Sequence, residues 1–180
     1  MKVIKNKLNI ELNLRTEEDF PIKGIEFIDI TPLVIQKDVF NKIVSKFKEE
    51  ILDKKIDYII APEARGFLFG GTIAYQLGIG FIPVRKVGKM PPTTVVSKFE
   101  YEKEYGKDIL ELPKLVNEEY KNKNFYIIDD IYATGNTVKA IKTEIEKLGG
   151  NVKGIGVVLN IVELNNDSNE VFSLIDVNEE

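Results

Sequence analysis

The stretch YIIDDIYATGNTVKAI, residues 126–141, decides the fold class of this chain. The apolar run at residues 125–128 is typical of a buried strand, and the acids Asp129 and Asp130 follow it directly. A short loop of small residues then leads into a helical pattern over residues 138–148. Such a loop presents free backbone N–H groups and the positive end of the helix dipole to one point, which is an arrangement that binds phosphate.

The side chains of this stretch indicate what accompanies the phosphate. The two carboxylates repel a phosphate, but they are strong acceptors for the hydroxyl groups of a sugar. Backbone amides for a phosphate beside acids for a ribose predict a site for a ribose 5-phosphate group. The loop residues of this site are Ala133, Thr134, Gly135, Asn136 and Thr137.

Strand-like and helix-like patterns alternate along most of the chain. The patterns are typical of strands at residues 57–61, 79–84 and 152–159 and of helices at residues 38–52 and 66–77. Their alternation predicts an α/β fold with a mostly parallel sheet and helices on both faces. Because ligands bind at the carboxyl ends of the strands in such sheets, we expect the segments after Ala61, Val84 and Ile128 to converge on one site.

The composition excludes several classes of protein. A net charge of −4 argues against nucleic acid as a partner, because the basic excess that binds phosphate backbones is missing. The chain has neither cysteine nor histidine, so thiolate metal sites and Ser-His-Asp or Cys-His catalysis are impossible. No apolar run is long enough to span a membrane, and the N-terminus lacks the apolar core of a signal peptide. We therefore expect one domain of 180 residues in the cytoplasm, with no membrane association.

The segment DDIYATGNT, residues 129–137, resembles the phosphoribosyl pyrophosphate (PRPP) signature of the type I phosphoribosyltransferases. That signature has two acids, two variable residues, Ala or Thr, Thr, Gly, a variable residue and Thr. The resemblance implies that these acids and the loop from Ala133 to Thr137 bind PRPP or AMP. It also implies the type I phosphoribosyltransferase fold, in which a small N-terminal hood covers the site.

A second segment, APEARGFLFGG at residues 61–71, resembles the pyrophosphate loop of the adenine phosphoribosyltransferases. In that family the peptide bond before a small residue of the loop is often cis. The resemblance implies that Arg65 holds pyrophosphate together with the backbone around Glu63 and Ala64.

The third segment, VRKVGKMPPTTVVSKFEYEKEYGKD at residues 84–108, resembles the catalytic lid of the same family. From its polar residues and prolines we expect residues 86–106 to be a long, mobile loop that excludes water from the reaction. The resemblance implies that Glu104 accepts the purine N7 proton. It further implies that Arg85, Lys86 and Lys89 supply positive charge for pyrophosphate.

The fourth segment, PIKGIEFIDITPL at residues 21–33, resembles the hood, which holds the purine base. By this resemblance the backbone of Glu26 reads the base edge and Phe27 stacks on one face of the ring. Ile131, just after the acid pair, would pack on the other face. Ile28 departs from the family pattern, which usually has Arg or Lys at this position.

Taken together, the four segments predict a single phosphoribosyltransferase domain. It would consist of a hood segment at residues 1–35 and a PRPP-binding core at residues 36–160, with the lid at residues 86–106. The resemblance implies a purine salvage enzyme that makes AMP and pyrophosphate from adenine and PRPP. It also implies a homodimer and a magnesium ion carried mainly by PRPP, without direct protein ligands.

Two alternatives remain open at the level of sequence. One is a sister enzyme for hypoxanthine, xanthine or guanine, which the Ile28 departure favours, although a 6-oxo base typically needs a cation that the hood lacks. The other is a PRPP-sensing regulator without catalysis, which the chain length and the lid glutamate argue against. An assay with a panel of bases distinguishes the adenine enzyme, the sister enzyme and the regulator.

Overall fold

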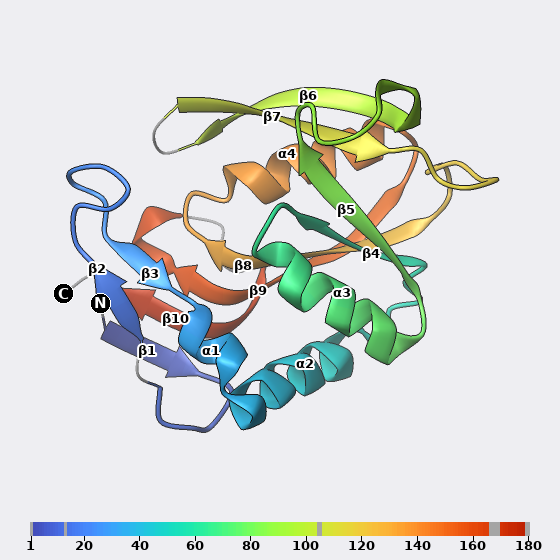
Figure 1. Cartoon of the computed structure of the whole chain (residues 1–180). Helices are drawn as coiled ribbons and strands as arrows, with labels where there is room; N and C mark the ends of the chain where they lie inside the picture. The colour runs from blue at the N-terminus through green and yellow to red at the C-terminus, as the bar shows by residue number, and fades with distance from the viewer. Residues whose placement is uncertain (1, 13, 104–105, 166–169, 179–180) are drawn as a thin grey trace.

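The computed structural model of the chain describes residues 2–12, 14–103, 106–165 and 170–178. Within these residues the strands form one sheet of eight strands in the order β1-β10-β9-β8-β4-β5-β7-β6, and a small sheet of β2 and β3 (Figure 1). The strands of the large sheet are β1 (Lys2–Asn6), β4 (Tyr58–Pro62), β5 (Gly80–Lys86), β6 (Val95–Lys103), β7 (Gly106–Pro113), β8 (Asn124–Tyr132), β9 (Asn151–Ile161) and β10 (Phe172–Asn178). The small sheet pairs β2 (Arg15–Glu17) with β3 (Phe27–Asp29).

The middle of the large sheet is parallel. The four pairings from β10 through β9, β8 and β4 to β5 are parallel, whereas β1 at one edge and β7 and β6 at the other pair antiparallel. The predicted α/β fold with a mostly parallel sheet is therefore confirmed. Since the parallel strands all point the same way, the loops that follow β4, β8 and β9 emerge at one edge of the sheet.

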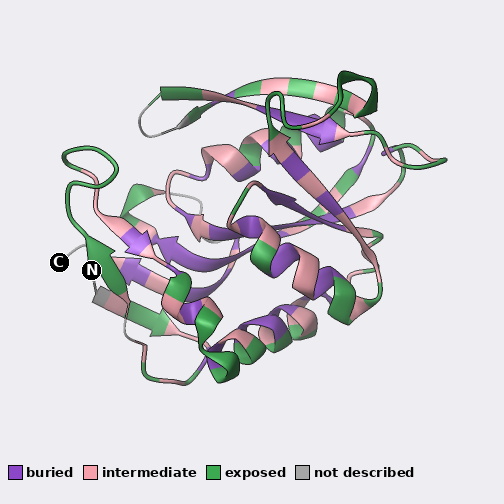
Figure 2. Cartoon of the chain, viewed as in Figure 1, coloured by how far each residue is buried: buried purple, intermediate pink, exposed green. Residues whose placement is uncertain are grey.

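Helices cover both faces of the sheet. The helices are α1 (Thr31–Ile35), α2 (Lys37–Ile51), α3 (Gly66–Leu77) and α4 (Asn136–Lys147), and short 3-10 turns lie at Pro92–Thr94 and Val162–Leu164. On one face α2 and α3 pack against alternate sheet residues such as Ile59 and Ile128, and on the other α4 packs against their neighbours Ile60 and Ile127 (Figure 2). This alternation follows from the two-residue period of a strand, and it explains why the middle strands are apolar throughout.

The lid segment differs from the loop that the sequence predicts. Residues 95–103 and 106–113 form an antiparallel hairpin, β6 and β7, which extends the sheet beyond β5 and lies over α4 in Figure 1. Along β6, exposed residues such as Lys98 and Glu100 alternate with the better buried Phe99 and Tyr101. The apolar side chains occur singly between charged ones. The segment therefore has the two-residue period of a strand, although its overall composition is that of a polar loop.

Both ends of the chain differ from the expectation as well. Residues 2–6, expected within the hood segment, pair with β10 and form an edge of the central sheet. The last residues, which carry little pattern in the sequence, form β10, whose Leu174, Ile175 and Val177 are fully buried. The part of the expected hood segment that borders the site comprises Pro21 and the residues from Gly24 to Ile28.

Among the described residues, no helix is long and apolar enough to cross a membrane.

Candidate functional site

A cavity of about 490 Å³ lies at the carboxyl edge of the parallel strands. Segments far apart in the sequence meet there, namely the hood, the loop after β4, the end of β8 and the start of α4. Of the predicted site residues, those that line it are Glu26, Phe27, Glu63, Ala64, Arg65, Lys86, Asp129, Asp130, Ile131, Ala133, Thr134, Gly135, Asn136 and Thr137. Convergence of the segments after β4 and β8 follows from their position after parallel strands.

Three predicted residues are placed differently. Arg85 and Lys89 belong to the described residues but lie outside the lining of this cavity. Glu104, the expected proton acceptor, lies outside the described residues.

The cavity also has lining residues that the sequence did not single out. They are Pro21, Gly24, Ile25, Pro62, Tyr101, Tyr132, Val138, Ile161 and Leu164. Ile28, noted above as a departure from the family pattern, also lines the cavity. Ile161 is the last residue of β9 and Leu164 lies just after it. Because β9 is the parallel neighbour of β8, knowledge of the strand order would have predicted both residues at the site. Tyr101 belongs to the hairpin of β6 and β7, a segment that the sequence predicts to be a loop.

The acid pair belongs to β8 and is not placed after it, because β8 continues to Tyr132 in register with β9. Asp129 and Asp130 are only 8% and 5% exposed. One oxygen of Asp129 accepts a hydrogen bond from the Asp130 N–H at 2.9 Å. Burial, reinforced by the neighbouring Asp130 carboxylate, raises the pKa of Asp129 well above its ordinary value. Hydroxyl groups or a positive charge in the cavity would favour its ionised form.

The loop after β8 has the geometry of an anion site. Gly135 has a φ of 78° and precedes α4, which starts at Asn136, two residues earlier than the apolar pattern indicates. A Cβ atom at Gly135 would lie 2.3 Å from the Tyr132 hydroxyl oxygen, so only glycine fits here. Asn136 and Thr137 therefore lie in the first helical turn, where backbone N–H groups have no partner within the helix.

Arg65 joins three parts of the cavity. Its Nε lies 2.7 Å from Oδ2 of Asp130, and its guanidinium carbon lies 5.4 Å from the ring centre of Phe27. The side chain remains 41% exposed, so it can contact a ligand.

The preceding Glu63–Ala64 peptide bond is cis, as the resemblance implies for this loop. The next residue, Gly66, starts α3 so close to β8 that a Cβ there would lie 3.0 Å from an oxygen of Asp129.

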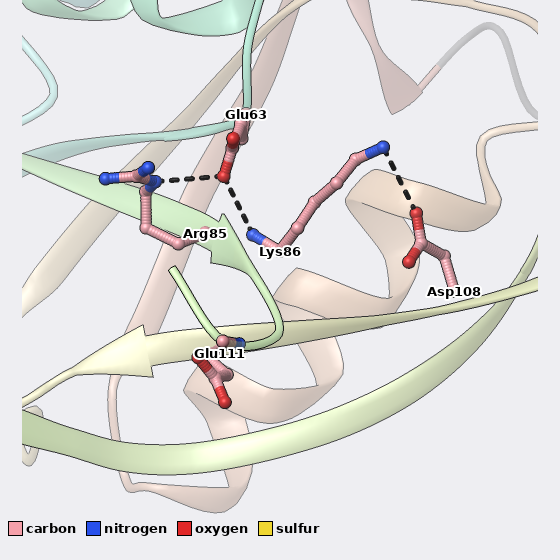
Figure 3. A network of polar contacts seen from close by, with 6 residues as sticks. Glu63, Arg85, Lys86, Asp108 and Glu111 are labelled. Atoms are coloured by element: carbon pink, nitrogen blue, oxygen red, sulfur yellow. Dashed lines mark hydrogen bonds and ion pairs between the residues drawn. The ribbon is translucent and has the colours of Figure 1, made fainter. Parts of the chain in front are cut away.

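The carboxylate of Glu63 faces the end of β5 (Figure 3). Its Oε2 accepts hydrogen bonds from Nε of Arg85 and from the backbone N–H of Lys86, each at 2.9 Å. Burial opposes ionisation, but these two hydrogen bonds and the Arg85 charge outweigh it and lower the pKa of Glu63. The side chain of Glu63 thus orients Arg85, and only its backbone is suited to hold an anion.

Two further carboxylates hold the base of the lid (Figure 3). Asp108 on β7 lies 3.5 Å from Nζ of Lys86. The buried Glu111 accepts a hydrogen bond from the N–H of Gly88 at 3.2 Å. Three of the cations expected to bind pyrophosphate, Arg65, Arg85 and Lys86, are thus paired with acids of the same chain.

The hood presents an aromatic side chain to the cavity. Phe27 packs edge-on against Phe20 with ring centres 5.1 Å apart. Ile28 is 2% exposed and packs into the core. The hood residues that line the cavity, Pro21 and those from Gly24 to Ile28, include neither lysine nor arginine.

Within the described part of the chain, no three acidic side chains gather as ligands for a metal ion. Two of the acids that border the cavity are paired with cations, Glu63 with Arg85 and Asp130 with Arg65. This donor set fits a magnesium ion that is bound mainly by the oxygens of a substrate, since such ions retain few protein ligands.

Comparison with known proteins agrees with this site. The family described as the phosphoribosyl transferase domain matches residues 32–178. An adenine phosphoribosyltransferase from Clostridium botulinum (strain Loch Maree / Type A3) is 43% identical over 157 residues, 87% of this chain and 89% of the relative. The crystal structure of adenine phosphoribosyltransferase from Thermoanaerobacter pseudethanolicus is 40% identical, with a TM-score of 0.81 and coverage of 91% of this chain and 95% of that one. The enzyme from Saccharomyces cerevisiae, solved with an imino-altritol bisphosphate and adenine, is 38% identical, with a TM-score of 0.78 and coverage of 89% of this chain and 93% of that one.

A shared fold and this identity over most of the length place the chain in the adenine phosphoribosyltransferase family.

Proposed function

We propose that this protein transfers ribose 5-phosphate from PRPP to adenine, giving AMP and pyrophosphate in purine salvage. One observation carries the proposal. A buried acid pair, a helix N-terminus, an exposed arginine and a stacking phenylalanine line the same cavity, which therefore offers contacts to each part of the substrates. The relatives named above are adenine phosphoribosyltransferases, and that from yeast was solved with adenine.

The phosphate and the ribose occupy the end of β8 and the start of α4. The backbone N–H groups from Thr134 to Thr137 hold the 5′-phosphate, supported by the helix dipole. Asp129 and Asp130 accept hydrogen bonds from the ribose hydroxyls. As the bond from C1′ to the pyrophosphate oxygen breaks, positive charge develops on the ribose, and a nearby carboxylate favours that charge.

The pyrophosphate lies against the loop of Glu63, Ala64 and Arg65, with Lys86 at the rim of the cavity. Binding exchanges the contact of Arg65 with Asp130 for one with pyrophosphate and leaves Asp130 to the ribose. Lys89, which lies outside the described cavity lining, reaches the pyrophosphate when the lid approaches. Arg85 acts on the pyrophosphate in the site of the partner subunit. Magnesium, when bound with PRPP, neutralises part of the pyrophosphate charge.

The base stacks between Phe27 and Ile131, and the backbone at Glu26 reads its edge. N9 forms the new bond to C1′ while pyrophosphate departs, and the proton on N7 passes to Glu104. Excluding water at this stage is the task of the lid, residues 86–106, because water would otherwise capture the ribosyl cation. The protein acts in the cytoplasm as a homodimer.

A panel of bases tests the proposal. Purified protein with PRPP and magnesium should release pyrophosphate and form AMP with adenine, and removal of the divalent cation by a chelator should abolish the activity. Hypoxanthine, xanthine and guanine should give little product, because the hood side of the cavity carries no cation for a 6-oxo group. Turnover with a 6-oxopurine alone would point to a sister enzyme. Tight PRPP binding without turnover of any base would point to a PRPP sensor.

A further inference from the structure

A chain of polar contacts runs from the C-terminal strand to the phosphate loop. Oδ1 of Asp176 on β10 accepts hydrogen bonds from the Ser173 hydroxyl at 2.5 Å and from Nδ2 of Asn160 at 3.2 Å. Asn160 lies on the neighbouring strand β9 and is 2% exposed. Polar groups this deeply buried need partners, so each of these contacts restricts the orientation of the next.

Asn165 makes the connection to the loop. Its Nδ2 lies 3.0 Å from Oδ1 of Asn160, 2.9 Å from the carbonyl oxygen of Ile161 and 3.0 Å from the carbonyl oxygen of Ala133. Ala133 precedes Asn165 by 32 residues and is the first residue of the phosphate loop. One amide nitrogen therefore joins the segment after β9 to the segment after β8.

The carboxylate of Asp176 sets the direction of the whole chain of contacts. An ionised carboxylate only accepts hydrogen bonds, so Asn160 must present its NH₂ group to Asp176 and its oxygen to Asn165. Asn165 must in turn present its NH₂ group to Asn160, and the same group reaches Ala133. A reversed amide at Asn165 would place its oxygen against three other oxygens.

Holding the carbonyl of Ala133 has a consequence for the next N–H group. In a trans peptide the C=O of one residue and the N–H of the following residue point in opposite directions. With the Ala133 carbonyl held toward Asn165, the N–H of Thr134 points away from Asn165. Thr134 lines the cavity whereas Asn165, a described residue, is not part of its lining.

We propose that Asn165 is a positioning residue for the 5′-phosphate, which it aids by orienting the Ala133–Thr134 peptide, with Asn160 and Asp176 orienting Asn165 in turn. The inference rests on the proposed function, because it needs a phosphate in this loop. It assigns a role in substrate binding to the C-terminal strand, which touches no part of the cavity itself within the described residues.

The test compares two ligands that use different parts of the site. AMP carries the 5′-phosphate, whereas pyrophosphate binds at the loop of Arg65. In the Asn165→Ala variant, calorimetry should show that the Kd of AMP rises roughly five- to tenfold, the effect of one buried hydrogen bond, while the Kd of pyrophosphate is unchanged. Asn165→Asp, nearly identical in shape, should weaken AMP further, because a carboxylate repels the three oxygens around it.

A matched control removes a similar contact at the opposite end of β8. Nδ2 of Asn124 donates to the carbonyl of Lys55 at 2.9 Å, so Asn124→Ala also removes an amide contact between two distant segments. It should lower Tm without changing the Kd of AMP. In the double variant Asn160→Ala/Asn165→Ala, the loss of binding free energy for AMP should be smaller than the sum of the losses in the two single variants. Both residues act through the same carbonyl, that of Ala133.

The outcomes separate this inference from the proposed function. Wild-type protein that binds AMP, together with an Asn165→Asp variant that binds it equally well, overturns the inference alone. Equal losses for AMP and pyrophosphate also overturn it, since they indicate general damage to the site. Wild-type protein that binds no AMP overturns the proposed function and the inference with it.

Discussion

At the residue scale, the charge state of Asp129 links stability to function. Burial raises its pKa, so above about pH 3.9, the ordinary pKa of aspartate, the folded protein keeps a proton that the unfolded chain has lost. Stability therefore falls as the pH rises through the interval between these two pKa values. The carboxylate that we propose for the ribose is therefore one that destabilises the folded chain.

Asp129→Asn should consequently raise stability and weaken binding. At neutral pH the Tm of the ligand-free variant should exceed that of the wild type by about 2–4 °C for each kcal/mol gained. The affinities for PRPP and AMP should both fall, because an amide replaces one acceptor with a donor. Calorimetry between pH 5 and 8 measures both effects, with the exposed Asp53→Asn as control. A lower Tm with unchanged AMP affinity would contradict this account.

Arg65 offers a second test at this scale, because we propose that it binds pyrophosphate. Removing its charge in Arg65→Ala should weaken PRPP and pyrophosphate by roughly 10- to 100-fold, the range for charged hydrogen bonds. AMP, which lacks the pyrophosphate, should lose less. Arg15→Ala is a suitable control, since Arg15 pairs with Asp29 outside the cavity lining. Equal losses for AMP and pyrophosphate would remove Arg65 from the pyrophosphate site.

At the element scale, the junction of β8 and α4 depends on one backbone conformation. Gly135→Ala places a methyl group at a φ of 78° and 2.3 Å from the Tyr132 hydroxyl oxygen, so the loop must move. We expect at least a tenfold loss of AMP and PRPP affinity, because the N–H groups no longer converge on the phosphate.

Gly149 provides the matched control, with a similar φ of 81° at the other end of α4. Its Cβ would meet the flexible side chain of Lys121 at 3.2 Å. Gly149→Ala should therefore cost stability, measured by urea denaturation, without affecting AMP binding. If both glycine variants bind AMP as the wild type does, the loop does not hold the phosphate.

The lid hairpin is tied to the same helix. The hydroxyl of Ser97 on β6 donates to Glu144 on α4 at 2.5 Å, and Glu144 also accepts from Lys147 at 3.0 Å. The part of the hairpin near Ser97 therefore moves with α4, whose first turn we propose to bind the phosphate. This contact confines the proposed closure of the lid to residues of the segment that lie farther from Ser97.

At the scale of the whole molecule, the proposed homodimer makes a prediction about Arg85. Glu63 holds Arg85 away from the cavity lining of its own chain, which is consistent with a role at the site of the partner subunit. Mixing Arg85→Ala chains with Glu104→Gln chains would then restore one intact site in each heterodimer and recover part of the activity. Light scattering establishes the dimer, and two affinity tags isolate the heterodimer. An isolated heterodimer no more active than its parents would place both residues in one site.

Local patterns in the sequence were sufficient to predict the middle of the sheet and the loop after β8. An apolar run such as residues 125–128 has few alternatives to a buried strand, and a glycine before a helical pattern marks its start. The helices at residues 38–52 and 66–77 were predicted within one residue of α2 and α3, because their apolar periodicity is local. These features depend on residues close together in the chain.

Local patterns could not predict contacts between residues that are far apart in the sequence. The hairpin of β6 and β7, the strand β10 and the continuation of β8 through Asp129 and Asp130 each depend on pairing with a partner strand. The contact of Asn165 with Ala133 and that of Glu63 with Arg85 likewise join separate segments. By itself, the sequence determined the middle strands, the longer helices and the residue types that line the cavity, because period and residue type are local properties. Only the tertiary structure decided which side chains hold the loops in place, because strand register brings them together across the sheet.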